Sequence, residues 1–248
     1  MTASSRSILS SRSVLIVDDE ADIRDSVSDI LLDFGYEVET AANGPEALAT
    51  LEQRPFDVAL LDFKMPGMDG LTLYREMRRL WPETSVILVS AYTGDGVAEE
   101  ALASGIRRVI SKPVDMSEVL SEVDRELERP LALVIDDDRD FCESLRDVLA
   151  ERGFRVSLAG DEESAAKQLQ TRQPRAVLLD VLLGRDSDST RILQSIRDCN
   201  PQAEVVVVTG HREETQPQIS ELVKSGAVAV CFKPLDIQRL LEQLPQPA

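Results

Sequence analysis

The sequence predicts an α/β protein with two doubly wound domains in tandem, each a parallel five-stranded sheet with helices on both faces. Two observations predict this fold class. The 248-residue chain contains an internal repeat that covers nearly its whole length. Within each copy, short apolar runs alternate with segments of helical periodicity, a pattern typical of β–α units joined by right-handed crossovers.

The two copies align without a gap over their first halves. Val-Asp-Asp at 17–19 matches Ile-Asp-Asp at 135–137, and Leu-Leu-Asp at 60–62 recurs at 178–180, both at an offset of 118. Near the end of each copy, a Lys-Pro pair recurs at an offset of 121. Such drift is typical of insertions in surface loops, so the repeat indicates two domains of one fold rather than one large domain.

Apolar runs and helical patterns alternate in the same order in both copies. In the first, strands are predicted at 14–17, 36–40, 58–61, 86–89 and 107–110, and helices at about 21–34, 45–53, 70–80, 95–104 and 115–128. In the second, strands are predicted near 131–135, 154–158, 175–179, 204–208 and 227–231. Pro217 is tolerated only in the first turn of a helix, so the fourth helix of this copy should begin near Thr215 or Gln216.

The boundary between the copies is short. A helical pattern ends near Arg129, Pro130 blocks its continuation, and Leu131 already begins an apolar run. We therefore expect one domain at 13–129 and a second at 130–244, with a disordered tail at 1–12 and a short tail at 245–248.

Charge and composition exclude several classes of function. The formal charge of -18 argues against direct binding to nucleic acid or to an anionic membrane, since both need a basic face. The chain has no apolar run long enough to span a bilayer. The three cysteines lack metal-ligand spacing and are expected to be reduced, which predicts a cytoplasmic protein.

Polar residues end the apolar strands of each copy, in the same order of residue types. In the first copy these are Asp18, Asp19, Asp62, Ser90 and Lys112; in the second they are Asp136, Asp137, Asp180, Thr209 and Lys233. The carboxyl ends of parallel strands meet at one edge of a sheet, which is where ligands bind in this class of fold. We therefore expect one site in each domain.

The residue types at this edge suit phosphoryl transfer. Three converging carboxylates repel one another, and a hard cation such as Mg²⁺ would relieve that repulsion. A lysine and a hydroxyl opposite them would hold the oxygens of a phosphoryl group. The sequence thus predicts an aspartyl phosphate at Asp62 and at Asp180. A single strand-end aspartate is as readily a helix cap or a turn residue, but five groups duplicated in order favour a site.

Both halves resemble receiver domains of the response-regulator family. The motifs that carry the resemblance in the first copy, over about 13–128, are Val17-Asp18-Asp19, Leu60-Leu61-Asp62, Met65-Pro66-Gly67-Met68-Asp69-Gly70, Ser90-Ala91 and Lys112-Pro113. In the second copy, over about 131–244, they are Asp136-Asp137, Asp180, Thr209-Gly210 and Lys233-Pro234. The resemblance implies a flavodoxin-like (CheY-like) fold with strand order 2-1-3-4-5 in each domain.

The resemblance also implies a role for each residue. Asp62 and Asp180 would accept a phosphoryl group from a histidine kinase or a histidine phosphotransfer protein. Mg²⁺ would be held by these two residues and by Asp18, Asp19, Asp136, Asp137 and the backbone carbonyls of Lys64 and Leu182. Lys112 and Lys233, each before a proline whose peptide bond is commonly cis in relatives, would clamp the phosphoryl group. Ser90 and Thr209 would move toward it and repack the neighbouring helix and strand.

Two departures from the family pattern stand out. Relatives usually carry an aromatic residue three positions before the lysine, whereas this chain has Val109 and Val230, so coupling to the output face is expected to be altered. The loop after Asp180 is one residue longer than the loop after Asp62, which predicts a different partner choice or dephosphorylation rate.

The sequence is compatible with three functions. About fifteen residues follow Lys233, too few for an effector domain, which favours a tandem phosphoacceptor, not an enzyme, that signals through a protein partner or passes phosphate onward. An aspartate-nucleophile phosphatase of the haloacid-dehalogenase kind expects a carboxylate two residues after the nucleophile, where this chain has Lys64 and Leu182. The third is a phosphate-independent scaffold with a degenerate second receiver. Whether the protein forms a homodimer is left open.

Overall fold

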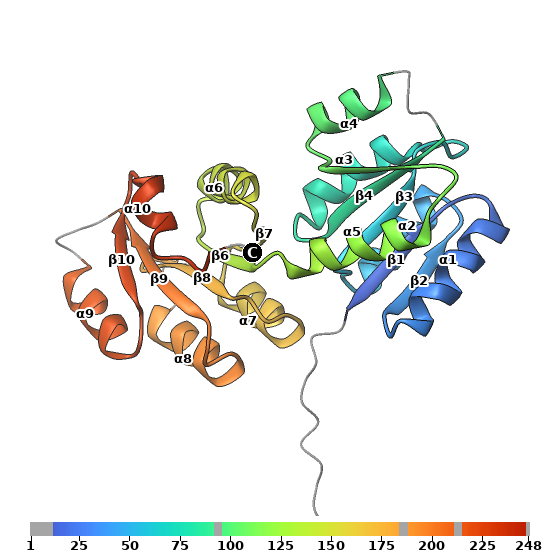
Figure 1. The fold of residues 1–248 in the computed structure, drawn as a ribbon. Helices are drawn as coiled ribbons and strands as arrows, with labels where there is room; N and C mark the ends of the chain where they lie inside the picture. The colour runs from blue at the N-terminus through green and yellow to red at the C-terminus, as the bar shows by residue number, and fades with distance from the viewer. Residues whose placement is uncertain (1–11, 92–95, 184–187, 211–214, 247–248) are drawn as a thin grey trace, which may run out of the picture. The chain divides into compact units, whose positions relative to one another are not determined.

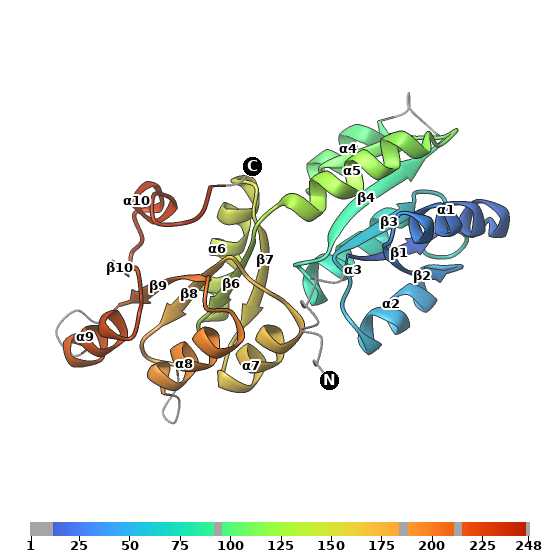
Figure 2. The ribbon, with the colours of Figure 1, turned by 60° about the horizontal axis from the view of Figure 1, so that its bottom comes forward.

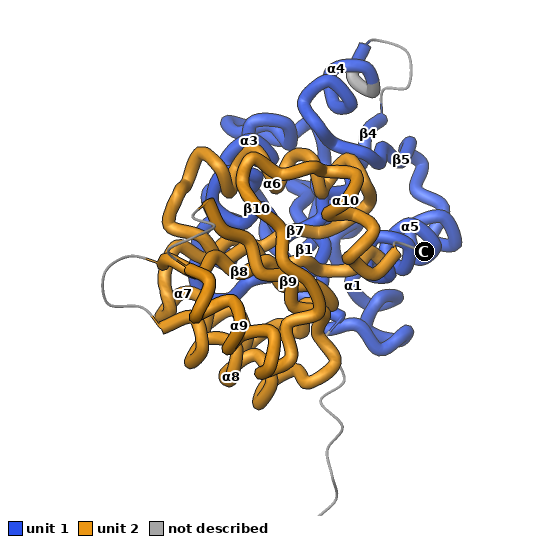
Figure 3. The backbone as a smooth tube through the Cα atoms, turned by 90° about the vertical axis from the view of Figure 1, so that its left-hand side faces the viewer, with its two compact units in different colours: residues 1–128 blue, residues 129–248 orange. Residues whose placement is uncertain are grey.

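The computed structural model describes residues 12–91, 96–183, 188–210 and 215–246 (Figure 1). The chain divides into two compact units, Met1–Glu128 and Arg129–Ala248, which are coloured separately in Figure 3. Each unit is an α/β domain built on one parallel five-stranded sheet, as the repeat predicts.

The first unit has the strand order β2-β1-β3-β4-β5, with every neighbouring pair parallel. Its strands are β1 (Ser13–Val17), β2 (Glu37–Ala41), β3 (Val58–Asp62), β4 (Ser85–Ser90) and β5 (Arg108–Ser111). Its helices are α1 (Ala21–Asp33), α2 (Gly44–Gln53), α3 (Gly70–Leu80), α4 (Val97–Ser104) and α5 (Met116–Glu128). The predicted strand order is confirmed, and the order of elements matches the pattern of apolar runs.

Helices cover both faces of this sheet, which explains why its central strands are apolar throughout. One apolar cluster joins one face of β1, β3 and β4 to α1 and α5, and it includes Val27, Leu31 and Val123. The other joins the opposite face to α2, α3 and α4, and it includes Leu51 and Leu73. Because β1 and β3 lie between two helical layers, every residue of both strands is buried.

The second unit repeats the arrangement with the order β7-β6-β8-β9-β10. Its strands are β6 (Leu131–Ile135), β7 (Arg155–Ala159), β8 (Ala176–Asp180), β9 (Glu204–Thr209) and β10 (Ala229–Phe232). Its helices are α6 (Arg139–Glu151), α7 (Glu162–Thr171), α8 (Ser189–Cys199), α9 (Gln216–Lys224) and α10 (Ile237–Leu241). In Figure 2, α7, α8 and α9 lie along one side of this sheet and α6 and α10 along the other, in agreement with its two apolar clusters.

Three details of the second unit concern its last two helices and its cysteines. Helix α9 begins at Gln216 after Thr215, with Pro217 in its first turn, as predicted. Helix α10 has only 5 residues, whereas the corresponding α5 has 13. Cys142 and Cys231 are buried in one apolar cluster of this unit, and Cys199 is exposed.

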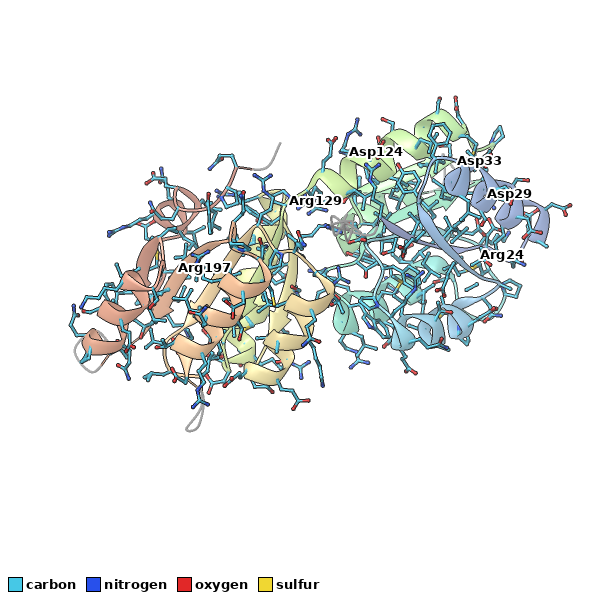
Figure 4. The ribbon with its side chains drawn as sticks, turned by 90° about the horizontal axis from the view of Figure 1, so that it is seen from below. Arg24, Asp29, Asp33, Asp124, Arg129 and Arg197 are labelled. Carbon is cyan, nitrogen blue, oxygen red and sulfur yellow. The ribbon has the colours of Figure 1, made fainter. Side chains whose placement is uncertain are left out.

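The two compact units divide after Glu128, and the domain bounds of 13–129 and 130–244 stay a prediction. The Arg129 guanidinium donates to the carbonyl oxygens of Gly153 and Phe154, at 3.1 and 2.5 Å (Figure 4). These hydrogen bonds connect Arg129 to the loop that precedes β7.

Arg12, which the sequence assigns to the N-terminal tail, also has defined partners. Its guanidinium is 2.6 Å from the carboxylate of Asp124 and lies over the ring of Tyr36, and its carbonyl accepts the N–H of Glu37. The rest of the predicted tail, residues 1–11, and residues 247–248 at the other end lie outside the described part of the chain. Among the described helices, each is too short or too polar to cross a bilayer.

Candidate functional site

The first candidate site lies at the carboxyl edge of the first sheet, where β1 and β3 end side by side. The two strands are parallel neighbours, paired in register at Val17 and Leu61. Asp18 follows β1 and Asp62 is the last residue of β3; both are buried, whereas Asp19 is exposed. Carboxylate oxygens of all three lie within 4.8 Å of one another. The fold therefore brings together the three carboxylates that the sequence singled out.

Lys112 places its ammonium group between two of these carboxylates. Its backbone N–H donates to the carbonyl of Ser90 at 2.8 Å, which fixes it beside the end of β4. Its Nζ atom lies 2.9 Å from Oδ1 of Asp62 and 3.0 Å from Oδ2 of Asp18. A third carboxylate, that of the exposed Glu20, is 3.5 Å away. The lysine thus bridges the two buried acids.

The carboxyl edge of the first sheet carries more negative than positive charge. Burial raises the pKa of Asp62, and the charge of Asp18 adds to this, while the hydrogen bond and charge of Lys112 partly oppose it. Burial alone would lower the pKa of Lys112, but its hydrogen bonds to Asp62 and Asp18 outweigh burial and raise it. The lysine therefore stays cationic, and one ammonium group faces several carboxylates.

This donor set fits a hard divalent cation. All three side chains offer oxygen ligands, which Mg²⁺ prefers, and a second positive charge would offset the remaining repulsion. The N–H of Lys64 donates to Oδ2 of Asp62 at 3.1 Å, so the backbone of residue 64 lies close to the carboxylate. Metal binding by the Lys64 carbonyl stays a prediction.

Ser90 is the last residue of β4 and is buried. Strand β4 is the parallel neighbour of β3, with Asp62 opposite Val89. The hydroxyl-bearing residue is therefore at the same sheet edge as the carboxylates, one strand further along. This is the place that the sequence predicts for it.

The second candidate site repeats these positions at the end of the second sheet. Carboxylate oxygens of Asp136, Asp137 and Asp180 lie within 4.8 Å of one another, again with the first and last buried and the middle one exposed. Thr209 ends β9 and is fully buried, and its carbonyl accepts the N–H of Lys233 at 2.8 Å. Both Lys-Pro peptide bonds, Lys112–Pro113 and Lys233–Pro234, are cis, as the resemblance implies.

Lys233 is placed differently from Lys112. Its Nζ atom is 2.5 Å from Oδ2 of Asp136 but 3.8 Å from the nearer oxygen of Asp180. It also lies over the ring of Phe141, 4.0 Å from the ring centroid. Oδ1 of Asp180 is buried and has no hydrogen-bond partner among the described residues. The lysine in this site lies within 3.0 Å of one acid, whereas Lys112 lies within 3.0 Å of two.

Burial also raises the pKa of Asp180, and the charge of Asp136 adds to this. The charge of Lys233 and hydrogen bonds from the backbone of Leu182 and Val181 oppose the shift. The Leu182 backbone therefore lies beside the carboxylate, as that of Lys64 does in the first site. Metal binding by the Leu182 carbonyl stays a prediction as well.

The loops that flank the two nucleophile positions differ at the start of the following helix. A Cβ atom on Gly70 would lie 2.4 Å from the carbonyl oxygen of Asp62, so the helix approaches the strand too closely for a side chain. In the second unit Ser189 takes this place and donates to the carbonyls of Val181, at 2.6 Å, and Asp180, at 3.2 Å. Residues 184–187 of the second loop lie outside the described part of the chain.

Sequence reasoning missed several neighbours of the sites. Arg24, labelled in Figure 4, donates to the carbonyl of Asp18 at 2.7 Å. Phe141, which the repeat offset of 118 pairs with Ile23, is the second such neighbour. Both residues lie on the helix that follows the acidic pair. Helical periodicity predicts which face of that helix is buried, but it does not show which side chains reach the site.

Comparison of the sequence with known protein families covers both candidate sites. The model of the response regulator receiver domain matches residues 14–124 and again residues 132–245. The chain belongs to the response regulator receiver family. Receiver domains are the phosphoacceptors of two-component signalling and interact with histidine kinases or phosphotransfer proteins; this chain holds two in tandem, receiver 1 and receiver 2.

Similar proteins include one that spans both receivers. A response regulator receiver protein of Anaeromyxobacter sp. (strain Fw109-5) is 34% identical over 204 residues, 82% of this chain and 84% of that protein. Sporulation initiation phosphotransferase F of Bacillus subtilis (strain 168) is 33% identical over 114 residues, 46% of this chain and 92% of that protein. Other curated relatives are longer, and the match covers 25% and 24% of two of them.

A solved structure is similar to one receiver. It is the response regulator TrrA of Thermotoga maritima in complex with Mg²⁺ and beryllium fluoride, 30% identical, covering 46% of this chain and 98% of that chain, with a TM-score of 0.43.

Proposed function

We propose that both receivers accept phosphoryl groups, receiver 1 on Asp62 and receiver 2 on Asp180, and that Mg²⁺ assists at each site. The observation that carries the proposal is the duplicated edge: in each unit a buried strand-end aspartate lies with two further carboxylates and a lysine that is fixed by the end of the next strand.

The chemistry follows from these parts. An aspartate oxygen attacks the phosphorus of a phosphohistidine, a P–O bond forms, and the P–N bond breaks with its electron pair returning to the imidazole. The lysine ammonium offsets the charge of the equatorial phosphoryl oxygens, and the hydroxyl of Ser90 or Thr209 donates to one of them. Water later attacks the phosphorus, the P–O bond to the aspartate breaks, and inorganic phosphate leaves. The protein thus acts as a phosphoacceptor and has no separate substrate.

The ligands proposed for Mg²⁺ are Asp18, Asp19, Asp62 and the Lys64 carbonyl in receiver 1, with Asp136, Asp137, Asp180 and the Leu182 carbonyl in receiver 2. The ion would supply positive charge to the carboxylates and to one phosphoryl oxygen. The all-oxygen donor set and the excess of carboxylates over ammonium groups support this assignment.

The donor would be a histidine kinase or a histidine phosphotransfer protein. Part of this chain is similar to a protein named as a phosphotransferase, which supports onward transfer of the phosphoryl group as one output. Contact with a downstream protein that recognises the phosphorylated state is the other.

Acetyl phosphate with Mg²⁺ tests the proposal without a known kinase. The full chain should gain up to two phosphoryl groups by intact mass spectrometry. Asp62→Asn and Asp180→Asn should each remove one, and the double variant should remove both. Chelation of the metal should slow both additions. A chain that gains none, while folded, would support a phosphate-independent scaffold instead.

A further inference from the structure

Receiver 2 differs from receiver 1 in what surrounds the lysine. Lys112 contacts three carboxylates, and two of them are within 3.0 Å. Lys233 contacts the carboxylate of Asp136 and the face of an aromatic ring, and it is 3.8 Å from Asp180. The corresponding helix position in receiver 1 is Ile23, which has no ring to offer.

The ring is held in place by its own helix. Asp138 precedes α6, and its carboxylate accepts the N–H of Phe141 at 3.0 Å, which caps the first turn of the helix. The Phe141 side chain packs against the apolar cluster formed by α6, β6 and β8. In receiver 1 the matching acid, Glu20, makes no such cap and faces the lysine instead. The sequence difference therefore replaces an anion near the lysine with an aromatic face.

We infer that Phe141 is a positioning residue, which holds the ammonium of Lys233 over its ring and beside Asp136, and so keeps it out of hydrogen-bond distance of Asp180 before phosphorylation. The inference rests on the proposed function of receiver 2. A cation over an aromatic face within about 6 Å of its centroid is attracted by the ring quadrupole. The separation of 4.0 Å lies well inside this range.

A second observation points the same way. Oδ1 of Asp180 is buried and lacks a hydrogen-bond partner among the described residues, whereas Oδ1 of Asp62 is 2.9 Å from Lys112. In receiver 2 an incoming phosphoryl group need not break a short lysine hydrogen bond to the accepting aspartate, because Lys233 is 3.8 Å from Asp180. The ammonium group of Lys233 lies beside the site, 3.8 Å from the carboxylate that would carry the phosphoryl group.

Two ring-free variants and one ring-keeping variant test this in the full chain. Phe141→Ile copies receiver 1, and Phe141→Leu removes the ring without a β-branch in the helix. Phe141→Tyr keeps the ring face and serves as the matched control. Melting temperatures show which variants are folded, so that a loss of packing is separated from a loss of positioning.

The first readout is the NMR shift of the Lys233 methylene protons next to Nζ, recorded without metal. The chain has five lysines, so Lys233→Arg assigns the signal. A lysine held over a ring shows an upfield shift from the ring current. We expect this shift in the wild type and in Phe141→Tyr, and its loss in Phe141→Ile and Phe141→Leu. A wild-type signal at the usual lysine position would overturn the inference.

The second readout is beryllofluoride affinity with Mg²⁺, measured in an Asp62→Asn background so that only receiver 2 binds. Without the ring, Lys233 should form a close ion pair with Asp180, like the pair between Lys112 and Asp62. The affinity of receiver 2 for beryllofluoride should then fall by about fivefold. Phe141→Tyr should stay within about twofold. Unchanged affinity in a folded ring-free variant contradicts the inference even where the lysine shift is lost. No binding at all in the Asp62→Asn background refutes the proposed function of receiver 2, and the metal-free lysine signal still decides the role of Phe141.

Discussion

The two receivers carry the same five types of functional group at the same strand ends, yet their lysines are placed differently. In receiver 1 the ammonium of Lys112 bridges Asp18 and Asp62 at 3.0 and 2.9 Å. In receiver 2 the ammonium of Lys233 is 2.5 Å from Asp136, and Asp180 keeps a buried oxygen without a partner among the described residues. Strand order fixes which groups meet. In receiver 2 the lysine also lies over the ring of Phe141, on the helix that follows the acidic pair.

Removal of the lysine should give the largest effect on stability. Lys112→Met leaves Asp18 and Asp62 buried without the ammonium between them. Breaking a buried ion pair by removing one partner costs about 3 kcal/mol, so receiver 1 should lose roughly that much free energy of unfolding without metal. Lys233→Met should cost receiver 2 less, because only one acid is within hydrogen-bond distance. Urea-dependent hydrogen exchange of β1 and β6 peptides measures each receiver within the full chain.

Mg²⁺ provides the control for this comparison. The ion should recover much of the stability lost in Lys112→Met, because it supplies positive charge to the same carboxylates. Equal losses in the two receivers would contradict the difference in lysine pairing.

The next largest effect is expected where α3 meets β3. Gly70→Ala places a Cβ atom 2.4 Å from the carbonyl oxygen of Asp62, and backbone must shift to relieve the contact. Overpacking of this kind costs about 2 kcal/mol. In receiver 2, Ser189→Gly loses the hydroxyl bonds to Val181 and Asp180 and should cost about 1 kcal/mol. The same exchange measurement separates the two, and a harmless Gly70→Ala would show that the approach of helix to strand is less close than described.

A smaller difference is expected at the residues that precede α1 and α6. Asp138→Ala removes a side-chain cap and should destabilise receiver 2 by about 1 kcal/mol. Glu20→Ala removes an exposed acid that caps nothing, and its effect should stay within about 0.5 kcal/mol. Thermal unfolding of the two variants at neutral pH compares them, and equal losses would argue against the cap.

A further difference between the receivers is pH-dependent and lies at the other end of the first sheet. Burial and the hydrogen bond to Asp124 raise the pKa of Tyr36 from 10.0 to about 12. Because the neutral form is favoured in the fold, this contribution to stability is complete below pH 10 and is lost as pH rises toward 12. Receiver 2 has Phe154 at the matching position and lacks this dependence.

Tyr36→Phe should therefore remove the alkaline decline of receiver 1 and cost about 1 kcal/mol at neutral pH. Spectrophotometric titration of the tyrosines measures the pKa directly. A Tyr36 that titrates at its ordinary value would contradict the burial of its hydroxyl beside Asp124.

Much of this comparison could be predicted from the sequence because it depends on periodicity. The continuous apolar runs at β1, β3, β6 and β8 reflect burial on both faces, and the acids that end them meet because parallel strands end at one edge. The offset of the repeat then pairs each functional residue with its counterpart.

The lysine environments could not be predicted, because they depend on side-chain placement. Phe141 and Ile23 are equally apolar in a helical pattern, and nothing in periodicity says which one faces an ammonium group. The partners of Arg129 could not be predicted for a similar reason, since the carbonyls of Gly153 and Phe154 lie more than twenty residues away.

The most direct test of the central claim is chemical trapping of the acyl phosphate. The full chain is treated with acetyl phosphate and Mg²⁺, then reduced with borohydride, which converts an aspartyl phosphate to homoserine, and its peptides are sequenced by mass spectrometry. The account predicts homoserine at positions 62 and 180. Homoserine at 62 alone would contradict it for receiver 2, and homoserine at neither position would contradict it altogether.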